Sequence, residues 1–305
     1  MFALDHRFFS SLLGLSVTAL PECGFDSLGL VDSPVPRTLT FIDSQRFLPE
    51  LVHNPNVTGA FCSELLAPEL ASARPDVVSL VVDDPRFWFY TTQNAVAVAR
   101  LAAMPPSQIH PTAVVAPNSD IAAKGVTIGA RCRIEPRVVI LSGVEIGDDS
   151  IVRAGSILGA EGFEHKRTSR GLLSVVHDGV VRIGARVEIG ALNAISKGFA
   201  YRATTIGDDT RTDNLVHIAH GAQIGRRCLL PAACMIAGSS TVGDDVWIGP
   251  AAAVSSQVTV GAGAVVSIGA VVTRDVPAHS RVTGNFAVPH ARFMARLKEL
   301  TREDQ

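Results

Sequence analysis

Residues 206–242 have the sequence IGDDTRTDNLVHIAHGAQIGRRCLLPAACMIAGSSTV, in which an aliphatic side chain recurs every six residues. The same step continues beyond this stretch as far as position 272. The twelve positions, of which only the threonine is not aliphatic, are Ile206, Thr212, Ile218, Ile224, Leu230, Ile236, Val242, Ile248, Val254, Val260, Val266 and Val272.

Three further runs share this period. They begin at Ile109, Ile128 and Ile183, and breaks in phase separate them. A period of six fits neither a helix, at 3.6, nor an alternating strand, at two, but it fits a short strand followed by a turn. Three such units close a triangular coil of eighteen residues, so the roughly 24 units predict about eight stacked coils. Glycine often follows the aliphatic residue, as a tight corner with an unhindered backbone requires.

Two breaks in phase mark insertions into this stack, at residues 159–182 and 196–205. Long loops that leave a rigid scaffold usually carry binding function, so these insertions are candidates for binding, although the sequence does not assign a role to residues 159–182. The alternative is a disordered, solvated loop.

Residues 1–106 lack the six-residue period. Apolar runs at 39–42, 57–62 and 77–82 alternate with helix-like stretches at 47–52, 65–73 and 87–104, which predicts a small α/β domain. Residues 8–20 favour an amphipathic helix over a signal peptide. We therefore expect an α/β domain at 1–106, a stack of coils at 107–285 and a short C-terminal helix at 286–305.

Composition narrows the class of function. The 27 Lys and Arg residues nearly balance 29 Asp and Glu residues, which argues against a nucleic-acid-binding surface. No segment has the run of about 18 apolar residues that spans a membrane. The five cysteines show neither metal-site nor disulfide spacing, which predicts a reducing, cytoplasmic location and no metal.

His220 is the candidate general base. It follows the inner position Ile218, so it should lie at a corner and face outward. Gly238 comes eighteen residues later, one full coil along the stack, and its N–H should therefore lie beside His220. A base and an oxyanion donor are what acyl transfer from a thioester to an amine needs.

These segments resemble one acyltransferase family. Gly159-Ala-Glu-Gly-Phe163, Thr205-Ile-Gly-Asp208, Asp213-Asn214, Ile218-Ala-His220 and Ile236-Ala-Gly238 are similar to the UDP-3-O-(3-hydroxyacyl)glucosamine N-acyltransferases of lipid A biosynthesis. The resemblance implies a left-handed parallel β-helix of hexapeptide repeats. It implies that His220 is the general base and Gly238 the oxyanion donor. It also implies that Phe41 and Phe47 sandwich a uracil ring, and that Asp213 and Asn214 belong to the site. His217 has two open roles, an inter-subunit hydrogen bond or a plain surface position.

The chain departs from the family at positions that contact substrate. Gln257 stands where the family has a second active-site histidine, and Lys197-Gly-Phe-Ala200 replaces Arg-Gly-Ala-Leu. Gly284-Asn-Phe-Ala-Val-Pro-His290 instead resembles the closing motif of coenzyme-A-dependent nucleotide-sugar N-acetyltransferases. That likeness implies that Gly284, Asn285 and Phe286 lie against the pantetheine arm.

We therefore predict a homotrimeric N-acyltransferase with no permanently bound cofactor. Its donor is an acyl-CoA or an acyl carrier protein, and its acceptor is a nucleotide-linked amino sugar. Basic residues Arg292, Arg296 and Lys298 either attract an acidic carrier protein or form an ordinary solvated helix face. Three alternatives stay open: a short-chain N-acetyltransferase outside lipid A synthesis, a non-catalytic trimeric binding module, which Gln257 favours, and a β-helical zinc enzyme. The last needs three converging histidines, of which His217 and His220 supply two.

Overall fold

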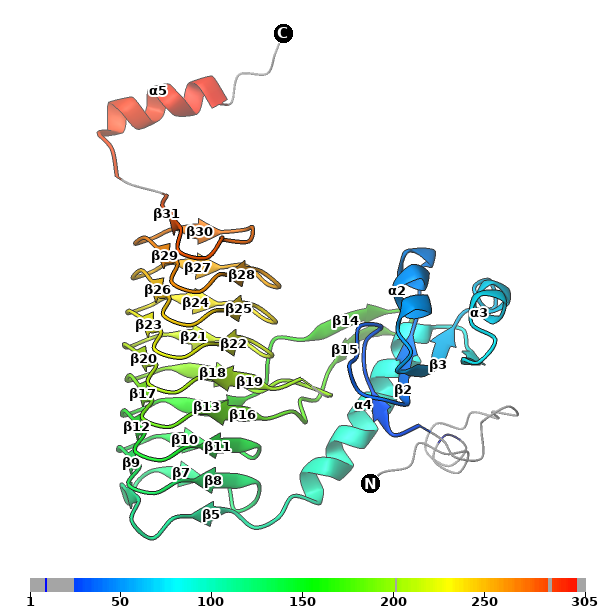
Figure 1. Cartoon of the computed structure of the whole chain (residues 1–305), viewed down its shortest axis with the longest axis horizontal. Helices are drawn as coiled ribbons and strands as arrows, with labels where there is room; N and C mark the ends of the chain where they lie inside the picture. The colour runs from blue at the N-terminus through cyan, green and yellow to red at the C-terminus, as the bar shows by residue number, and fades with distance from the viewer. Residues whose placement is uncertain (1–8, 10–24, 201, 285–286, 301–305) are drawn as a thin grey trace.

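The computed structural model describes residues 9, 25–200, 202–284 and 287–300. A column of stacked coils forms one half of the molecule, and a small α/β domain lies beside its middle (Figure 1). Apart from Phe9, the apolar segment at 8–20 lies outside the described residues, as do Asn285 and Phe286.

The coils form a left-handed parallel β-helix, which confirms the predicted fold. Its three flat sides are sheets of eight, nine and eight strands, in agreement with the expected eight coils. The β5 sheet contains β5 (Gln108–Ile109), β8 (Val126–Ile128), β11 (Val144–Ile146), β16 (Val181–Ile183), β19 (Thr204–Ile206), β22 (Gln223–Ile224), β25 (Thr241–Val242) and β28 (Thr259–Val260). The β6 sheet contains β6 (Val114–Val115), β9 (Arg133–Ile134), β12 (Ile151–Val152), β17 (Glu188–Ile189), β20 (Arg211–Thr212), β23 (Leu229–Leu230), β26 (Trp247–Ile248), β29 (Val265–Val266) and β31 (Arg281–Val282). The β7 sheet contains β7 (Asp120–Ile121), β10 (Val139–Ile140), β13 (Ile157–Ala160), β18 (Ala194–Ser196), β21 (His217–Ile218), β24 (Met235–Ile236), β27 (Ala253–Val254) and β30 (Val271–Val272).

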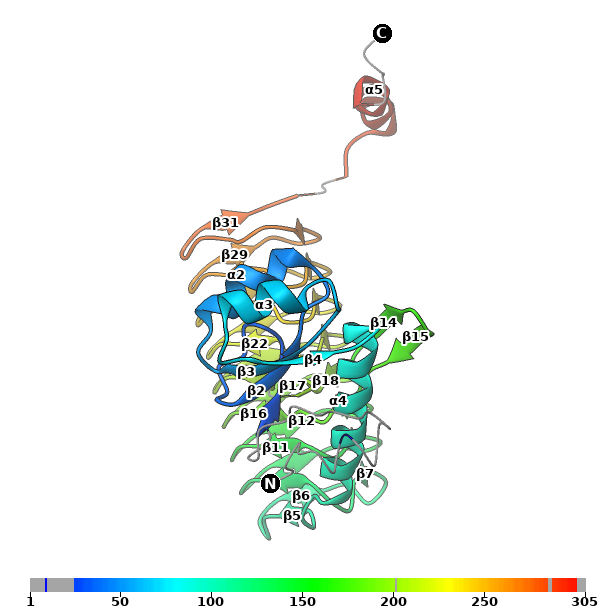
Figure 2. The same cartoon turned by 90° about the vertical axis from the view of Figure 1, so that its right-hand side faces the viewer.

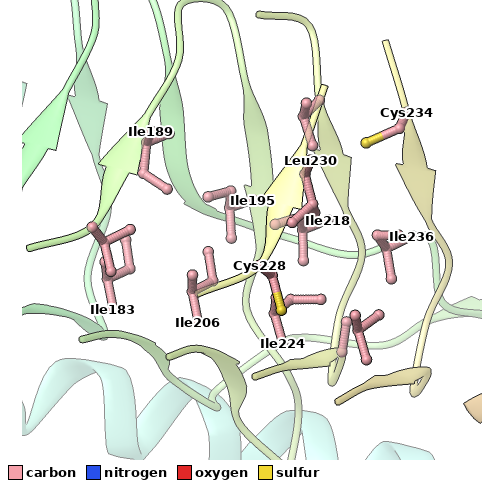
Figure 3. Packing of buried hydrophobic residues seen from close by; sticks show 14 of the residues in the cluster. Ile183, Ile189, Ile195, Ile206, Ile218, Ile224, Cys228, Leu230, Cys234 and Ile236 are labelled. Carbon is pink, nitrogen blue, oxygen red and sulfur yellow. The ribbon is translucent and has the colours of Figure 1, made fainter. Parts of the chain in front are cut away.

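The second residue of nearly every two-residue strand points into the column, as does the last residue of β8, β11, β16 and β19, and these mostly aliphatic side chains stack there (Figure 3). Paired strands keep the eighteen-residue register, as Ile218 opposite Ile236 shows. Thr212, the polar exception, is buried, and its Oγ1 accepts hydrogen bonds from Gly190 N at 3.0 Å and Asn193 Nδ2 at 2.7 Å. The hydroxyl is therefore satisfied inside an apolar column.

The glycines that directly follow an inward aliphatic residue, such as Gly147, are required by space rather than by backbone dihedral angle. A Cβ on Gly147 would lie 2.6 Å from the backbone carbon of Gly184 in the next coil. The positive φ of each corner falls two residues after the glycine, at Asp149 (61°) and Arg186 (57°). Coils stack closely because these glycines leave room for the neighbouring backbone.

The N-terminal domain has the predicted alternation of strands and helices. Its parallel sheet has the order β1 (Ser27–Leu28), β2 (Thr38–Phe41), β3 (Val57–Cys62) and β4 (Val78–Val81). Its helices are η1 (Gln45–Phe47), α2 (Leu48–His53), α3 (Ala67–Ala73) and α4 (Pro85–Ala102). The two-residue strand β1 is the one element of this sheet that the sequence analysis missed.

The 159–182 insertion is a hairpin, not a loop without regular structure. Strands β14 (His165–Thr168) and β15 (Gly171–Ser174) pair antiparallel and lie alongside α4 (Figure 2). Its last turn is fixed to α4 through the buried Asp178 carboxylate, which accepts from Gln93 Nε2 at 2.7 Å and Arg100 Nη1 at 3.0 Å. The insertion thereby connects the α/β domain to the coils.

The C-terminal helix α5 (His290–Leu300) lies beyond the last coil and confirms the predicted element, although it begins four residues after the predicted boundary at 286. In the part of the chain that the structure describes, every helix is too short or too polar to cross a bilayer.

Candidate active site

His220 and Gly238 lie at the same corner, where the chain passes from the β7 sheet to the β5 sheet. Ser239 N donates to His220 O at 3.0 Å, so the two coils are in register here. A Cβ on Gly238 would lie 2.9 Å from both Cε1 and Nε2 of His220. Glycine is therefore the residue that lets the imidazole lie flat against the next coil.

The Gly238 N–H has no hydrogen-bond acceptor among the described residues. At the other corner of the β5 sheet, where the chain passes to the β6 sheet, a side-chain oxygen from the next coil accepts from the corresponding N–H, as Asp148 does for Ala130 and Asp244 does for Arg226, both at 2.8 Å. The position thus binds a negatively charged oxygen elsewhere in the same fold. At Gly238 it is left open beside the imidazole, where an oxyanion would develop during acyl transfer.

The insertion supplies a carboxylate to the other edge of the ring. Glu164 Oε2 lies 3.4 Å from His220 Nε2. The Glu164 side chain is 15% exposed and the His220 side chain 16%. Glu164 Oε1 pairs with Lys166, whose ammonium group lies 5.0 Å from the centre of the Tyr90 ring. A series of contacts thus runs from Tyr90 of α4 through Lys166 and Glu164 to His220.

Burial and charge oppose each other at His220. Burial lowers the pKa of the imidazole, the Glu164 carboxylate raises it, and Lys166 and Arg202 lower it further. The net effect holds the pKa of His220 below its ordinary value. The side chain is therefore neutral near pH 7 and able to accept a proton.

A second histidine, His177, packs against His220 with ring centres 5.5 Å apart. It is fully buried, and burial followed by the proximity of His220 lowers its pKa to about 4. Its Nδ1 lies 3.0 Å from the Val175 carbonyl oxygen, which can only accept, so Nδ1 carries the proton. Its Nε2 has no partner among the described residues.

Two cavities adjoin this corner and share Asp32, Arg202 and Gln257 in their walls. One, of about 540 Å³, is lined by Gly221 and Ser239. The other, of about 470 Å³, is lined by Phe41 and Phe47 together with Asp43, Arg46, Arg86, Tyr90 and Lys166. The two aromatic residues predicted to hold a nucleobase thus border one cavity, which opens toward the coil that carries His220.

Other predicted site residues fall elsewhere in the single chain. Asp213 and Asn214 occupy the corner before β21, and His220 the corner after it, so one side of the triangle separates them. His217 lies on the outer surface of β21, where its Nδ1 is 3.1 Å from the Ala194 carbonyl oxygen. Gly284 borders a third cavity of about 330 Å³ at the far end of the stack. Roles for these residues remain predictions.

Sequence analysis missed the side chains that the insertion brings to His220. Glu164, Lys166 and His177 lie in an insertion that it associated with binding without assigning a role, and Tyr90 lies in a stretch assigned only as helix. The one available signal was position, since the insertion leaves the stack at Ala160 and returns at Val181 beside the corner that holds His220.

Within the described ranges, no group of three or more His, Cys, Asp or Glu side chains is arranged to hold a metal ion. The model of the bacterial transferase hexapeptide family (six repeats) matches residues 125–160. UDP-3-O-acylglucosamine N-acyltransferase of Bordetella pertussis is 28% identical over 297 residues, which cover 84% of this chain and 79% of that protein.

In its repeats and in its sequence matches, the chain is similar to the hexapeptide-repeat acyltransferases.

Other acyltransferases are also similar to this chain. The enzyme of the same name from Caulobacter sp. is 37% identical over 158 residues, which cover 52% of this chain and 46% of that protein. The one from Herminiimonas arsenicoxydans is 28% identical and covers 77% of this chain and 78% of its own length. Among solved structures, Arabidopsis UDP-N-acetylglucosamine acyltransferase aligns with a TM-score of 0.48 at 21% identity, over 63% of this chain and 76% of that one.

Proposed function

We propose that this acyltransferase moves an acyl group from a thioester to the amine of a nucleotide-linked amino sugar. The observation that carries the proposal is the open Gly238 N–H beside the neutral His220 imidazole at one corner of the helix. Its named relatives are N-acyltransferases of UDP-3-O-acylglucosamine, which makes a UDP-linked glucosamine the first acceptor to test.

In the proposed reaction the amine lone pair attacks the thioester carbonyl carbon. His220 takes a proton from the nitrogen as the N–C bond forms, and the Gly238 N–H binds the oxyanion. When the carbonyl re-forms, the C–S bond breaks and the sulfur leaves with the proton that His220 held. The products are an amide and a free thiol.

The cavity that Phe41 and Phe47 border is proposed to hold the nucleotide. An aromatic ring offers a π face to a nucleobase, and Phe47 already carries the Arg46 guanidinium 4.5 Å from its ring centre. Arg86 and Arg202 add positive charge to the wall, which suits a diphosphate. Gln257 borders both cavities and is placed to contact the sugar between them.

We propose that the active form is a homotrimer. Leu192, Leu215 and Ile268 are each close to 60% exposed along the corner between the β6 and β7 sheets. Leu229 and Trp247 flank that corner on one side, and Met235 and Val271 on the other. We call these seven residues the apolar ridge.

A threefold axis along the apolar ridge would bury it against two further copies. Three triangular columns that meet at their corners leave wedge-shaped clefts between them, and His220 borders such a cleft. In that arrangement a neighbouring copy, rather than the same chain, would bring residues such as Asp213 and Asn214 into the cleft. The outer positions of the β5 sheet are polar instead, namely Gln108, Thr127, Glu145, Arg182, Thr205, Gln223, Thr241 and Thr259.

The test is direct assay of the purified protein. UDP- and dTDP-linked amino sugars would be incubated with acetyl-CoA, 3-hydroxyacyl-CoA or 3-hydroxyacyl carrier protein, and products identified by mass spectrometry. A mass increase of one acyl group on the sugar amine, absent with the His220→Ala variant, is the expected result. No acylated sugar from any pairing would contradict the proposal, and the productive donor distinguishes coenzyme A from a carrier protein.

A further inference from the structure

The second carboxylate oxygen of Glu164 is the starting point. Oε1 is paired with Lys166, whereas Oε2 faces His220 Nε2 and has no other contact in the described part of the chain. The 3.4 Å separation exceeds the roughly 2.7–3.2 Å of an ordinary N–H···O bond. Glu164 therefore does not hold the imidazole as the acid of a catalytic triad does, and Oε2 keeps its capacity to accept another donor.

The chemistry of an amine acceptor calls for such a group. An amine with a pKa near ~8 is largely an ammonium ion at neutral pH, and it must lose a proton before it can attack. The cavity walls carry charges of both signs, but the carboxylates of Asp32 and Asp43 are paired with Arg202 at 2.9 Å and with Arg86 at 2.6 Å. Glu164 is the carboxylate that faces the imidazole itself, so it is the group that would attract an ammonium ion to the place where it must react.

We propose that Glu164 is the specificity-determining residue: it binds the acceptor amine in its ammonium form and presents it to His220. This inference rests on the proposed function. Oε2 accepts one ammonium N–H while a second N–H points at His220 Nε2. The ammonium N–H bond breaks, the proton moves to Nε2, and the lone pair stays on the nitrogen. His220 then releases that proton to solvent and is neutral again for the attack on the thioester.

The carboxylate has a cationic partner before and after this transfer. It faces the substrate ammonium first and the imidazolium next, so the negative charge that binds the acceptor also stabilises the protonated base. A hydroxyl acceptor carries no charge and lacks the first effect, although Glu164 would still stabilise the imidazolium that forms when His220 takes its proton. Glu164 would thus favour amines over hydroxyls at this site.

Other charged and titratable groups surround the pair. Lys166 and His177 come from the insertion, Arg202 from the 196–205 segment, His217 from β21 and Tyr90 from α4. Burial opposes the charge on Lys166, but Tyr90 and Glu164 raise the pKa of Lys166 above its ordinary value. Lys166 therefore stays positive beside Glu164.

The experiment compares Glu164→Gln with Glu161→Gln, a matched loss of one carboxylate on the same insertion. Glu161 is 54% exposed and lies 3.9 Å from His177 rather than against His220. Calorimetry at about pH 6.5 would measure the Kd of UDP-3-O-acylglucosamine and of its analogue with a hydroxyl in place of the amine. We expect Glu164→Gln to weaken the amine ligand about tenfold or more and the hydroxyl analogue by less than about twofold.

Kinetics give a second readout. The loss of kcat/KM in Glu164→Gln should be largest near pH 6.5 and shrink near pH 9, where the amine arrives neutral. Glu164→Asp, which keeps the charge, should retain the preference for the amine, and circular dichroism would verify folding. Equal weakening of both ligands, a loss independent of pH, or the same effect from Glu161→Gln would overturn the inference.

The two proposals fail separately. If the wild-type protein acylates no amine but its affinity for the amine ligand depends on Glu164, acyl transfer is overturned and ammonium recognition stands. If the wild-type protein acylates the sugar and Glu164→Gln binds both ligands as the wild type does, ammonium recognition by Glu164 is overturned and acyl transfer stands.

Discussion

The coils and the 159–182 insertion both reach His220, but they do so by different physical means. The coils bring Gly238 to the ring through a fixed eighteen-residue register in which backbone hydrogen bonds join each turn to the next. The insertion brings Glu164 and His177 through a hairpin that is held by contacts with α4. The first arrangement is local and repeated, whereas the second depends on three segments far apart in sequence.

The comparison shows that two parts of the molecule contribute different properties to this site. The helix fixes where the base and the oxyanion donor stand, and the insertion fixes the charge around them. Variants on either side of the ring therefore test different properties.

The largest expected effect follows from breaking the assembly of the coils. Leu215→Glu combined with Trp247→Glu puts two charges on the apolar ridge, so burying it would leave unpaired charges between copies. We expect a monomer by light scattering and loss of nearly all acyl transfer. Thr241→Glu with Thr259→Glu, on the polar β5 sheet, is the control and should remain trimeric. A monomeric wild-type protein would contradict the proposed assembly.

Removing the imidazole of His220 tests the residue that both the coils and the insertion contact. His220→Ala should lower kcat at least ~100-fold, because the amine would lose its proton without a positioned acceptor. Its oligomeric state and thermal midpoint should match those of the wild type, since His220 lies outside the aliphatic column. Turnover within about threefold of wild type would remove His220 from the mechanism.

Two glycine variants sharpen the comparison, because each crowds the same ring from one region. A Cβ on Gly238 would lie 2.9 Å from His220 Nε2, and one on Gly162 would lie 2.5 Å from His220 Cδ2. Displacing the ring by about 1 Å can cost up to ~100-fold in rate, so we expect both Gly238→Ala and Gly162→Ala to lose about 10- to 100-fold in kcat. Leu172→Ala, at an exposed position of the same hairpin, is the control. Full activity of Gly162→Ala would mean that the insertion does not fix the ring.

The smallest expected effect concerns stability and belongs to the insertion alone. Because the pKa of His177 is lowered to about 4 in the folded chain, the unfolded chain binds the proton first as pH falls below ~6.5. The neutral buried ring therefore contributes stability above ~6.5, and up to roughly 3 kcal/mol is lost as pH falls toward 4. The thermal midpoint of His177→Gln should fall less than that of the wild type between pH 7 and pH 4.5. Identical pH dependence of the two midpoints would contradict the burial argument.

Most of the N-terminal domain also followed from sequence pattern. The runs at 57–62 and 77–82 correspond closely to β3 and β4, and Pro105 marks the end of α4 closely. Phe41 and Phe47 were predicted to share a nucleobase site, and they border one cavity. The hydrophobic pattern could not reveal that Tyr90 of α4 would lie under Lys166 of the insertion, since no period links them.

By itself, the sequence determined the β-helix, its approximate number of coils and the pairing of His220 with Gly238. Each of these follows from a six-residue period that forces aliphatic side chains inward and stacks every eighteenth residue. Only the tertiary structure decided what surrounds the base. The positions of Glu164, Lys166 and His177 depend on how a hairpin folds against a helix some seventy residues earlier, and such long-range packing leaves no periodic signal in the chain.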